Sequence, residues 1–163
     1  MQITVIAVGK LKERHWREAV DEYVKRLGAY ASVRVVEIDD RDHERLGDDR
    51  ARSAEGSDIA RAIEAAPGAG GGGRPYVVAL DIQGKARSSE ELASLISDLP
   101  HRGYSSLVFV IGGSVGLDSA VLSAADERLS FGPMTLPHNL ARVVLVEQIY
   151  RAYRIARGEP YHK

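Results

Sequence analysis

The sequence predicts a single α/β domain built on a parallel β-sheet. Five short apolar segments rich in β-branched residues alternate with segments of helical periodicity, which is the pattern typical of parallel sheets. Two of the apolar segments, VVALDI and LVFVIG, are almost continuously apolar, as expected for strands that helices cover on both faces. A length of 163 residues suits one compact domain spanning residues 1–163 rather than two domains.

The expected elements follow one another in regular alternation. We expect strands over Ile3–Val8, Val33–Ile38, Tyr76–Asp81, Leu107–Ile111 and Arg128–Phe131. We expect helices over Arg14–Tyr30, Arg50–Ala65, Ser89–Leu99, Asp118–Ala125 and Pro137–Arg157. Ser88 and Glu91 have the spacing of a capping box at the start of the third helix. Pro137 suits the first turn of the last helix, and Gly158 suits the position just past its end.

The glycine-rich stretch over residues 67–75, PGAGGGGRP, is interpreted as a flexible connector between a helix and a strand. A phosphate-binding loop would need a Lys–Ser/Thr pair and a helix start directly after the glycines, and neither follows here. The connector therefore belongs to the same domain.

Composition limits the chemistry and the location. The absence of cysteine excludes disulfides, thiolate zinc sites and a cysteine nucleophile, and it fits a reducing compartment. Met1–Gly9 resembles a strand rather than a signal peptide, and no apolar run approaches the ~20 residues of a membrane span. We therefore expect a cytoplasmic protein with no membrane segment and no metal.

The net charge of −1 argues against a broad basic surface for nucleic acid. The charge is uneven, however, because residues 138–163 carry +3 and the remaining 137 residues carry −4. A basic C-terminal end permits a local contact with RNA. It is equally typical of a solvated helix face.

Two segments after strands are candidates for ligand binding. Gly112, Gly113 and Gly116 follow an apolar strand, where glycines let a backbone approach a ligand, although a tight turn would use them too. The segment Leu129–Leu140 is unusually apolar for a loop and would suit an adenine ring and a methionine chain. A buried crossover connection without a ligand is the alternative.

The final helix and the tail hold the candidate catalytic groups. Arg142 projects into the apolar arc of the helix, so it either reaches a site or pairs with a carboxylate across a helix–helix interface. The apolar face with Leu145 and Ile149 predicts a homodimer built largely on this helix. The tail ends in Tyr161, His162 and Lys163, which can stack on a base, move a proton and hold a phosphate, unless it is a frayed end.

The chain resembles the ribosomal large-subunit pseudouridine N3-methyltransferase family, a branch of the SPOUT methyltransferases. The resemblance rests on ITVIAVGKLKERHWREAVDEYVKRLGAY, VALDIQGK, FVIGGSVGL and LSFGPMTLPHNLARVVLVEQIYRAYRIARGEPYHK. These stretches span most of the chain and leave only the region over about 39–75 uncovered.

The resemblance implies an α/β knot, with a trefoil knot at the C-terminal end, and S-adenosylmethionine as cofactor. It assigns cofactor contacts to Leu80, Gly112, Phe131, Gly132, Pro133, Met134, Thr135 and Leu136. It also implies a homodimer that methylates a pseudouridine in helix 69 of 23S rRNA within the 70S ribosome. Within this resemblance we assign catalytic roles to Arg142, Tyr161 and His162. The alternatives are a knotted methyltransferase acting on tRNA and a ribosome-associated binding module without turnover.

Overall fold

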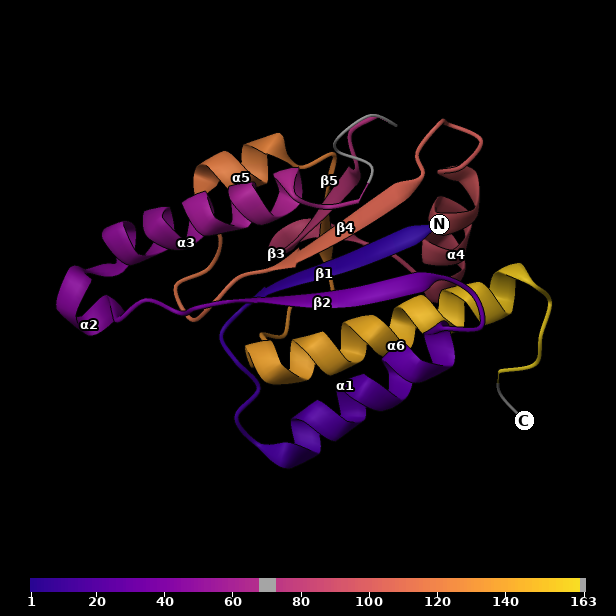
Figure 1. The fold of residues 1–163 in the computed structure, drawn as a ribbon, viewed down its shortest axis with the longest axis horizontal. Coiled ribbons are helices and arrows are strands. Elements are labelled where there is room, and N and C mark those ends of the chain that lie inside the picture. The colour runs from indigo at the N-terminus through magenta and orange to yellow at the C-terminus, as the bar shows by residue number, and fades with distance from the viewer. Residues whose placement is uncertain (68–72, 162–163) are drawn as a thin grey trace.

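The computed structural model describes residues 1–67 and 73–161 as a parallel sheet flanked by helices (Figure 1). The strands are β1 (Gln2–Val8), β2 (Ser32–Ile38), β3 (Tyr76–Ala86), β4 (Ser106–Ile111) and β5 (Glu127–Ser130). They form one sheet in the order β2-β1-β4-β3-β5, and every neighbouring pair is parallel. The predicted fold class is confirmed. The predicted connector over 67–75 lies mostly outside the described residues.

The helices match the sequence prediction closely. They are α1 (Arg14–Leu27), α2 (His43–Leu46), α3 (Asp48–Glu64), α4 (Ser89–Asp98), α5 (Ser119–Ala124) and α6 (His138–Ala156). Only α2, a single turn, was not predicted, because four residues are too few to show helical periodicity. Its N-cap Asp42 accepts a hydrogen bond from the backbone N of Arg45 at 3.0 Å.

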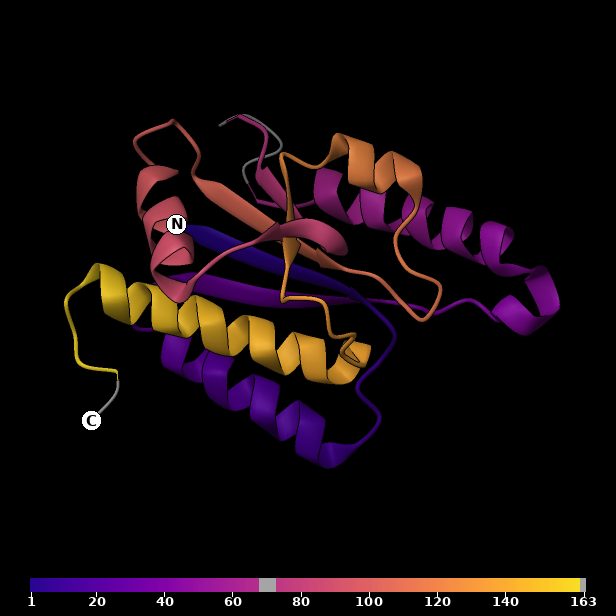
Figure 2. The same ribbon diagram turned by 180° about the vertical axis from the view of Figure 1, so that it is seen from behind.

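Two layers of helices cover the sheet. The alternation of side chains along β1 sends Ile3 and Val5 to one face and Ile6 and Val8 to the other. The first face packs against α1, α4 and α6, and the second packs against α3 and α5 (Figures 1 and 2). Both faces of the central strands are therefore buried, which explains their continuously apolar sequence.

Local signals set the helix ends. The capping box at α4 is confirmed, since the Ser88 side chain accepts from the Glu91 backbone and the Glu91 side chain accepts from the Ser88 backbone. Gly158 has φ of 65°, a left-handed conformation that ends α6 as predicted. The placement of Pro137 was wrong by one residue, because this extended residue is the N-cap and not part of the first turn.

The apolar face of α6 does not form a free surface, so that reasoning for a dimer was wrong. Leu145, Ile149 and Ala152 are fully buried within the subunit's own core, beneath the sheet and beside α1 and α4. The periodicity identified a buried face correctly but could not show which surface covers it. Any dimer contact must involve other residues.

The carboxyl ends of the strands and the start of α6 meet at one edge of the molecule (Figures 1 and 2). A Cβ placed on Gly9, just after β1, would lie 3.3 Å from Nε2 of His138 in the first turn of α6. Ligands of open α/β sheets bind at this edge. No helix within residues 1–67 or 73–161 has the length and apolar character of a membrane span.

Candidate functional site

A cavity of about 490 Å³ opens at the carboxyl edge of the sheet. Its walls come from the outer part of β3, the loops after β4 and β5, and the first turn of α6. Seven of the residues predicted to contact the cofactor line it, namely Leu80, Gly112, Phe131, Gly132, Met134, Thr135 and Leu136. Pro133, the remaining one, does not line it. The fold thus brings three distant segments of the predicted site together.

The loop after β4 forms a tight turn over one side of the cavity. Gly113 and Gly116 pair as an antiparallel bridge, and the backbone N of Gly116 donates to the carbonyl of Gly113 at 3.1 Å. A Cβ on Gly112 would lie 2.9 Å from the carbonyl carbon of Gly116, so the turn requires glycine there. Arg52 of α3 donates from Nε to the carbonyl of Val115 at 2.9 Å and fixes the loop from behind.

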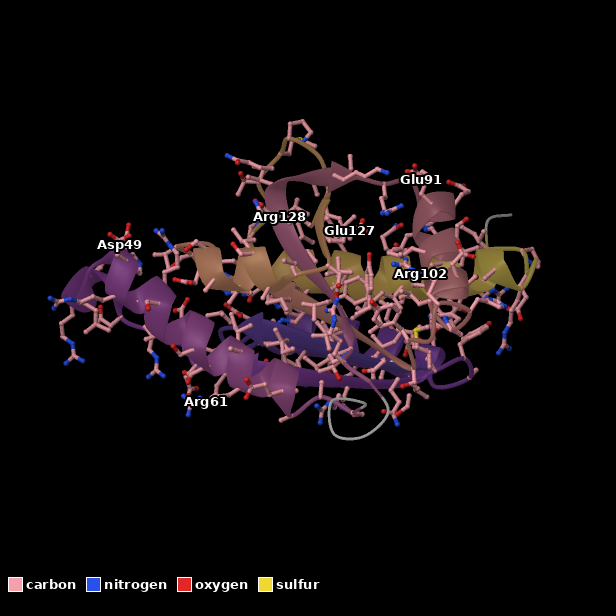
Figure 3. The ribbon with its side chains drawn as sticks, turned by 90° about the horizontal axis from the view of Figure 1, so that it is seen from above. Asp49, Arg61, Glu91, Arg102, Glu127 and Arg128 are labelled. Atoms are coloured by element: carbon pink, nitrogen blue, oxygen red, sulfur yellow. The ribbon has the colours of Figure 1, made fainter. Side chains whose placement is uncertain are left out.

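A bulge in β3 forms a second wall that the sequence did not predict. Leu129 of β5 pairs first with Leu80 and then with Lys85, so residues 81–84 bulge out of the ladder. The chain curves where it passes Arg128 (Figure 3). A Cβ on Gly84 would lie 2.7 Å from the Arg128 backbone, so only glycine fits at this crossing. Such bulges commonly re-aim side chains beside binding sites.

The third wall is the loop after β5, which a buried serine ties to the bulge. The hydroxyl oxygen of Ser130 lies 3.2 Å from the carbonyl oxygen of Ile82 and accepts from the backbone N of Gly132 at 3.1 Å. Gly132 has φ of 111°, which favours glycine strongly. At the cavity mouth, Ile82 and Met134 are 55% and 79% exposed. The loop is therefore held at its base and presents apolar side chains outside.

Arg142 lies beneath this site and does not line the cavity. Its side chain is fully buried, with Nη1 2.7 Å from Oε1 of Glu37 and Nη2 2.8 Å from the carbonyl of Gly9. The same Glu37 oxygen accepts from the backbone N of Leu11 at 3.0 Å. Burial lowers the pKa of Arg142 and the Glu37 carboxylate opposes that shift, so the guanidinium stays charged. The carboxylate partner predicted as the alternative exists, but it comes from a strand rather than a helix.

The tail up to Tyr161, where the described residues end, folds back onto its own subunit. Glu159 accepts from Tyr30 at 2.6 Å and pairs with Arg154 at 3.0 Å. Tyr161 donates to Oε1 of Glu147 at 2.6 Å and does not line the cavity. Glu147 lies nine positions after His138, which lines the cavity, so the two are about 14 Å apart along the axis of α6. His162, the other predicted catalytic residue, lies outside the described residues.

The basic C-terminal end is largely committed to contacts within the subunit. Arg151 pairs with Glu147 at 2.7 Å, and Arg157 lies over the Tyr30 ring at 4.5 Å from its centroid. With Arg142 on Glu37 and Arg154 on Glu159, four arginines of the segment have intramolecular partners. Composition could not show these partners, because several of them are distant in the sequence. The local contact with RNA stays a prediction. In the part of the chain that the structure describes, no group of three or more acidic or histidine side chains could hold a metal ion.

Comparisons of this chain with known protein families agree with the fold and the site described above. A family model described as "Predicted SPOUT methyltransferase" matches residues 1–162. The chain belongs to the SPOUT methyltransferase family. Listeria monocytogenes has a "Ribosomal RNA large subunit methyltransferase H" that is 49% identical over 164 residues, covering 100% of both chains. The relative of that name in Clostridium novyi is 48% identical over 170 residues, again covering 100% of both.

Solved structures of other SPOUT methyltransferases share the fold at low identity. The tRNA (m1G37) methyltransferase from Aquifex aeolicus matches with a TM-score of 0.58 and 15% identity, over 100% of this chain and 75% of that one. The SpoU methyltransferase AviRb from Streptomyces viridochromogenes, solved in complex with the cofactor AdoMet, matches with a TM-score of 0.51 and 13% identity, over 98% and 59%. These likenesses confirm the architecture alone.

Sequence reasoning missed two ionisable side chains of this SPOUT methyltransferase that line the cavity. Asp81 sits in the bulge, where Oδ1 accepts from the backbone N of Gln83 at 3.1 Å and Oδ2 lies 3.7 Å from Nη1 of Arg128. His138 begins α6 at the opposite wall. The available signals were a carboxylate near a strand end and a histidine directly after Pro137. Without the bulge, Asp81 looked like the polar end of a strand.

Proposed function

We propose that this chain transfers a methyl group from S-adenosylmethionine to RNA of the large ribosomal subunit. The observation that carries the proposal is a single cavity lined by seven of the residues that the family resemblance assigns to the cofactor. Relatives at 48–49% identity over their full length, named as methyltransferases of large-subunit ribosomal RNA, support the substrate class.

The cavity fits this cofactor in size and in lining. About 490 Å³ lies within the range of roughly 300–1,000 Å³ typical of small-molecule pockets. Leu80, Phe131 and Leu136 supply apolar surface for an adenine ring and an aliphatic chain. Gly112 and Gly132 line the cavity without a side chain that could cover their backbone groups, and the turn leaves no room for a Cβ on Gly112. Once bound, the cofactor supplies an electrophilic methyl group on a sulfonium.

At a finer level, the substrate that we propose is N3 of a pseudouridine in helix 69 of 23S rRNA within the 70S ribosome, modified in the cytoplasm by a homodimer. This imide nitrogen is a weak nucleophile until its proton leaves. The chain must therefore align N3 with the methyl carbon and favour loss of that proton. We assign these tasks to Tyr161 and His162 of the tail. Arg142, buried on Glu37, serves the same site by positioning the backbone beside it.

The homodimer in this proposal rests on the cavity mouth and the tail rather than on the apolar face of α6. Ile82 and Met134 are large apolar side chains that a monomer would leave in water. The tail is docked about 14 Å along α6 from its own cavity, which favours service to the site of another subunit. The trefoil knot implied by the resemblance belongs to the same proposal.

The substrate is tested by methyl transfer from radiolabelled cofactor to 70S ribosomes, 50S subunits and bulk tRNA. We expect label in 23S rRNA of 70S ribosomes at least ~100-fold above that in tRNA, mapped to N3 of one helix 69 pseudouridine. Label in tRNA alone would favour the tRNA methyltransferase. Cofactor binding by calorimetry without transfer to any of the three would favour a binding module.

Action of the tail in trans is tested by mixing two inactive variants. One lacks residues 161–163, and the other carries Gly112→Val in an otherwise intact chain. If the tail serves the partner, a mixed dimer holds one intact cavity with one intact tail and has half the activity of a wild-type dimer. Random exchange in an equal mixture makes about half of the dimers mixed, so activity returns to about a quarter of the wild type. Exchange of subunits is verified by mass spectrometry under native conditions. Confirmed exchange without recovery would place the tail's action within its own subunit.

A further inference from the structure

The carboxylate of Glu147, near the middle of α6, collects more donors than a helix surface pair requires. Its Oε1 accepts from Nη2 of Arg151 at 2.7 Å, from Nε of Arg151 at 3.1 Å and from the hydroxyl of Tyr161 at 2.6 Å. Its Oε2 accepts from Nε2 of Gln148 at 2.6 Å. The side chain is only 16% exposed. An ordinary exposed i,i+4 pair would use Arg151 alone.

Tyr161 is held by this carboxylate and by two neighbouring side chains of α6. Its ring meets Tyr150 edge-on with centroids 5.5 Å apart, and the Arg151 guanidinium lies over it at 4.2 Å from the centroid. Its hydroxyl is the donor in the hydrogen bond to Glu147. The ring of Tyr161 therefore packs against side chains of α6, and its hydroxyl is bound to a charged acceptor.

The same carboxylate reaches toward the loop after β5. Gln148 accepts from the hydroxyl of Ser89 at 2.7 Å while it donates to Glu147. It also lines a second cavity of about 320 Å³, whose other walls include Phe131 and Leu136. One oxygen of Glu147 thus holds the tail, and the other holds a side chain beside the loop that we assign to the cofactor.

We propose that Glu147 is the positioning residue of the C-terminal tail, and that Tyr161 anchors the tail on Glu147 rather than accepting the proton from the substrate. This inference rests on the proposed function of the tail. It changes the role of Tyr161 from a group that acts on the substrate pseudouridine to one that fixes the position of the tail on α6.

Charge and burial favour Tyr161 as an anchor of the tail rather than as a proton acceptor. Burial raises the pKa of Tyr161, and the hydrogen bond to Glu147 raises it further, so its hydroxyl stays protonated at neutral pH. Burial also acts to raise the pKa of Glu147, but the hydrogen bonds from Tyr161 and Arg151 outweigh it and the pKa is lowered. A protonated phenol that donates to a carboxylate is a poor acceptor for the proton of the substrate. Its hydrogen bond to a charged acceptor is strong, however, and can hold the tail in place.

The test compares Tyr161→Phe, Glu147→Ala and the double variant. We expect each single variant to lower kcat for methyl transfer by about 10- to 100-fold, the scale of one lost hydrogen bond to a charged group. The double variant should be no worse than the poorer single variant, because both remove the same bond. Glu147→Gln keeps an acceptor oxygen and should recover part of the loss. Cofactor affinity should not change in Tyr161→Phe, which leaves Gln148 in place, and the shape of the pH–rate profile should not change in any of these variants.

Glu18→Gln serves as the control, because it breaks an exposed arginine–carboxylate pair on α1 that touches neither tail nor cavity. Multiplicative losses in the double variant, or loss of one limb of the pH profile in Tyr161→Phe, would overturn the proposal and make Tyr161 the proton acceptor. Wild-type activity in both single variants would contradict the proposal that Tyr161 anchors the tail on Glu147. If Glu147→Ala folds poorly, Tyr161→Phe tests the same hydrogen bond, because it removes only the hydroxyl oxygen.

Limited digestion by a carboxypeptidase separates this proposal from the function it rests on. If Tyr161 anchors the tail on Glu147, Tyr161→Phe and Glu147→Ala should lose their C-terminal residues about 10-fold faster than the wild type, because the contacts of Glu159 with Tyr30 and Arg154 do not protect the residues beyond them. Faster cutting with no methyl transfer in the wild type would leave the anchor standing and contradict the proposed reaction. Unchanged cutting in both folded variants would contradict the anchor itself, whatever RNA the wild type methylates.

Discussion

Gly112→Val is expected to lower the affinity for S-adenosylmethionine by about 100-fold or more while leaving a folded protein. A Cβ at this position would lie 2.9 Å from the carbonyl carbon and 3.1 Å from the carbonyl oxygen of Gly116, and 3.1 Å from Cγ of Leu117. Two of these atoms are backbone, so they cannot rotate away. The turn must move instead, and overpacking of this kind costs roughly 1–3 kcal/mol before the larger branches of valine are counted.

The displaced turn lines the cavity, so the strain acts on the bound cofactor rather than on the core. Arg52 and the Gly113–Gly116 bridge restrict the turn from two sides, which leaves movement toward the cavity. Titration calorimetry measures the affinity, and thermal unfolding verifies the fold. Val115→Ala is the matched control, because Val115 belongs to the same turn, keeps its Cβ in the variant and does not line the cavity. Unchanged affinity in a folded Gly112→Val protein would contradict the assignment of the cavity.

The layered fold could be predicted because its signals are local. Apolar runs such as Leu107–Ile111 and the capping box at Ser88 depend on neighbouring residues, and every predicted strand and long helix is present. The bulge over residues 81–84 could not be predicted in the same way. It arises from a shift in the pairing of β3 with Leu129, some 45 residues away in sequence, and periodicity carries no information about that register.

The candidate site was predictable to the extent that it follows a motif. Gly112 and the segment over 131–136 stood out as loops after strands, and the fold places them around one cavity. Ser130 was not identified, because its role is to bridge Ile82 and Gly132 across two elements. The partners of several charges on the last helix could not be named for the same reason, although a carboxylate for Arg142 was one of the two alternatives. Their partners, such as Glu37 for Arg142, are distant in sequence.

Arg142→Ala is expected to lower the free energy of unfolding by roughly 2–4 kcal/mol, less than for a fully buried ion pair, because the Glu37 side chain is 34% exposed and water can reach it. The Glu37 carboxylate would lose its cation, and the carbonyl of Gly9 would lose its donor. That loss is a large share of the roughly 5–15 kcal/mol that stabilises a typical domain. Urea unfolding followed by circular dichroism measures it, with Glu37→Gln as the variant that keeps an acceptor for Leu11.

The double variant Arg142→Gln/Glu37→Gln separates stability from catalysis. It removes both charges, so neither is left unpaired, and the new amide at position 142 can still donate to the carbonyl of Gly9. If Arg142 works by holding the backbone after β1 against α6, most of the lost stability should return, and methyl transfer should return with it to within about 10-fold of the wild type. A stable double variant that binds the cofactor yet transfers methyl groups at least ~100-fold more slowly would instead show that the guanidinium acts on the substrate.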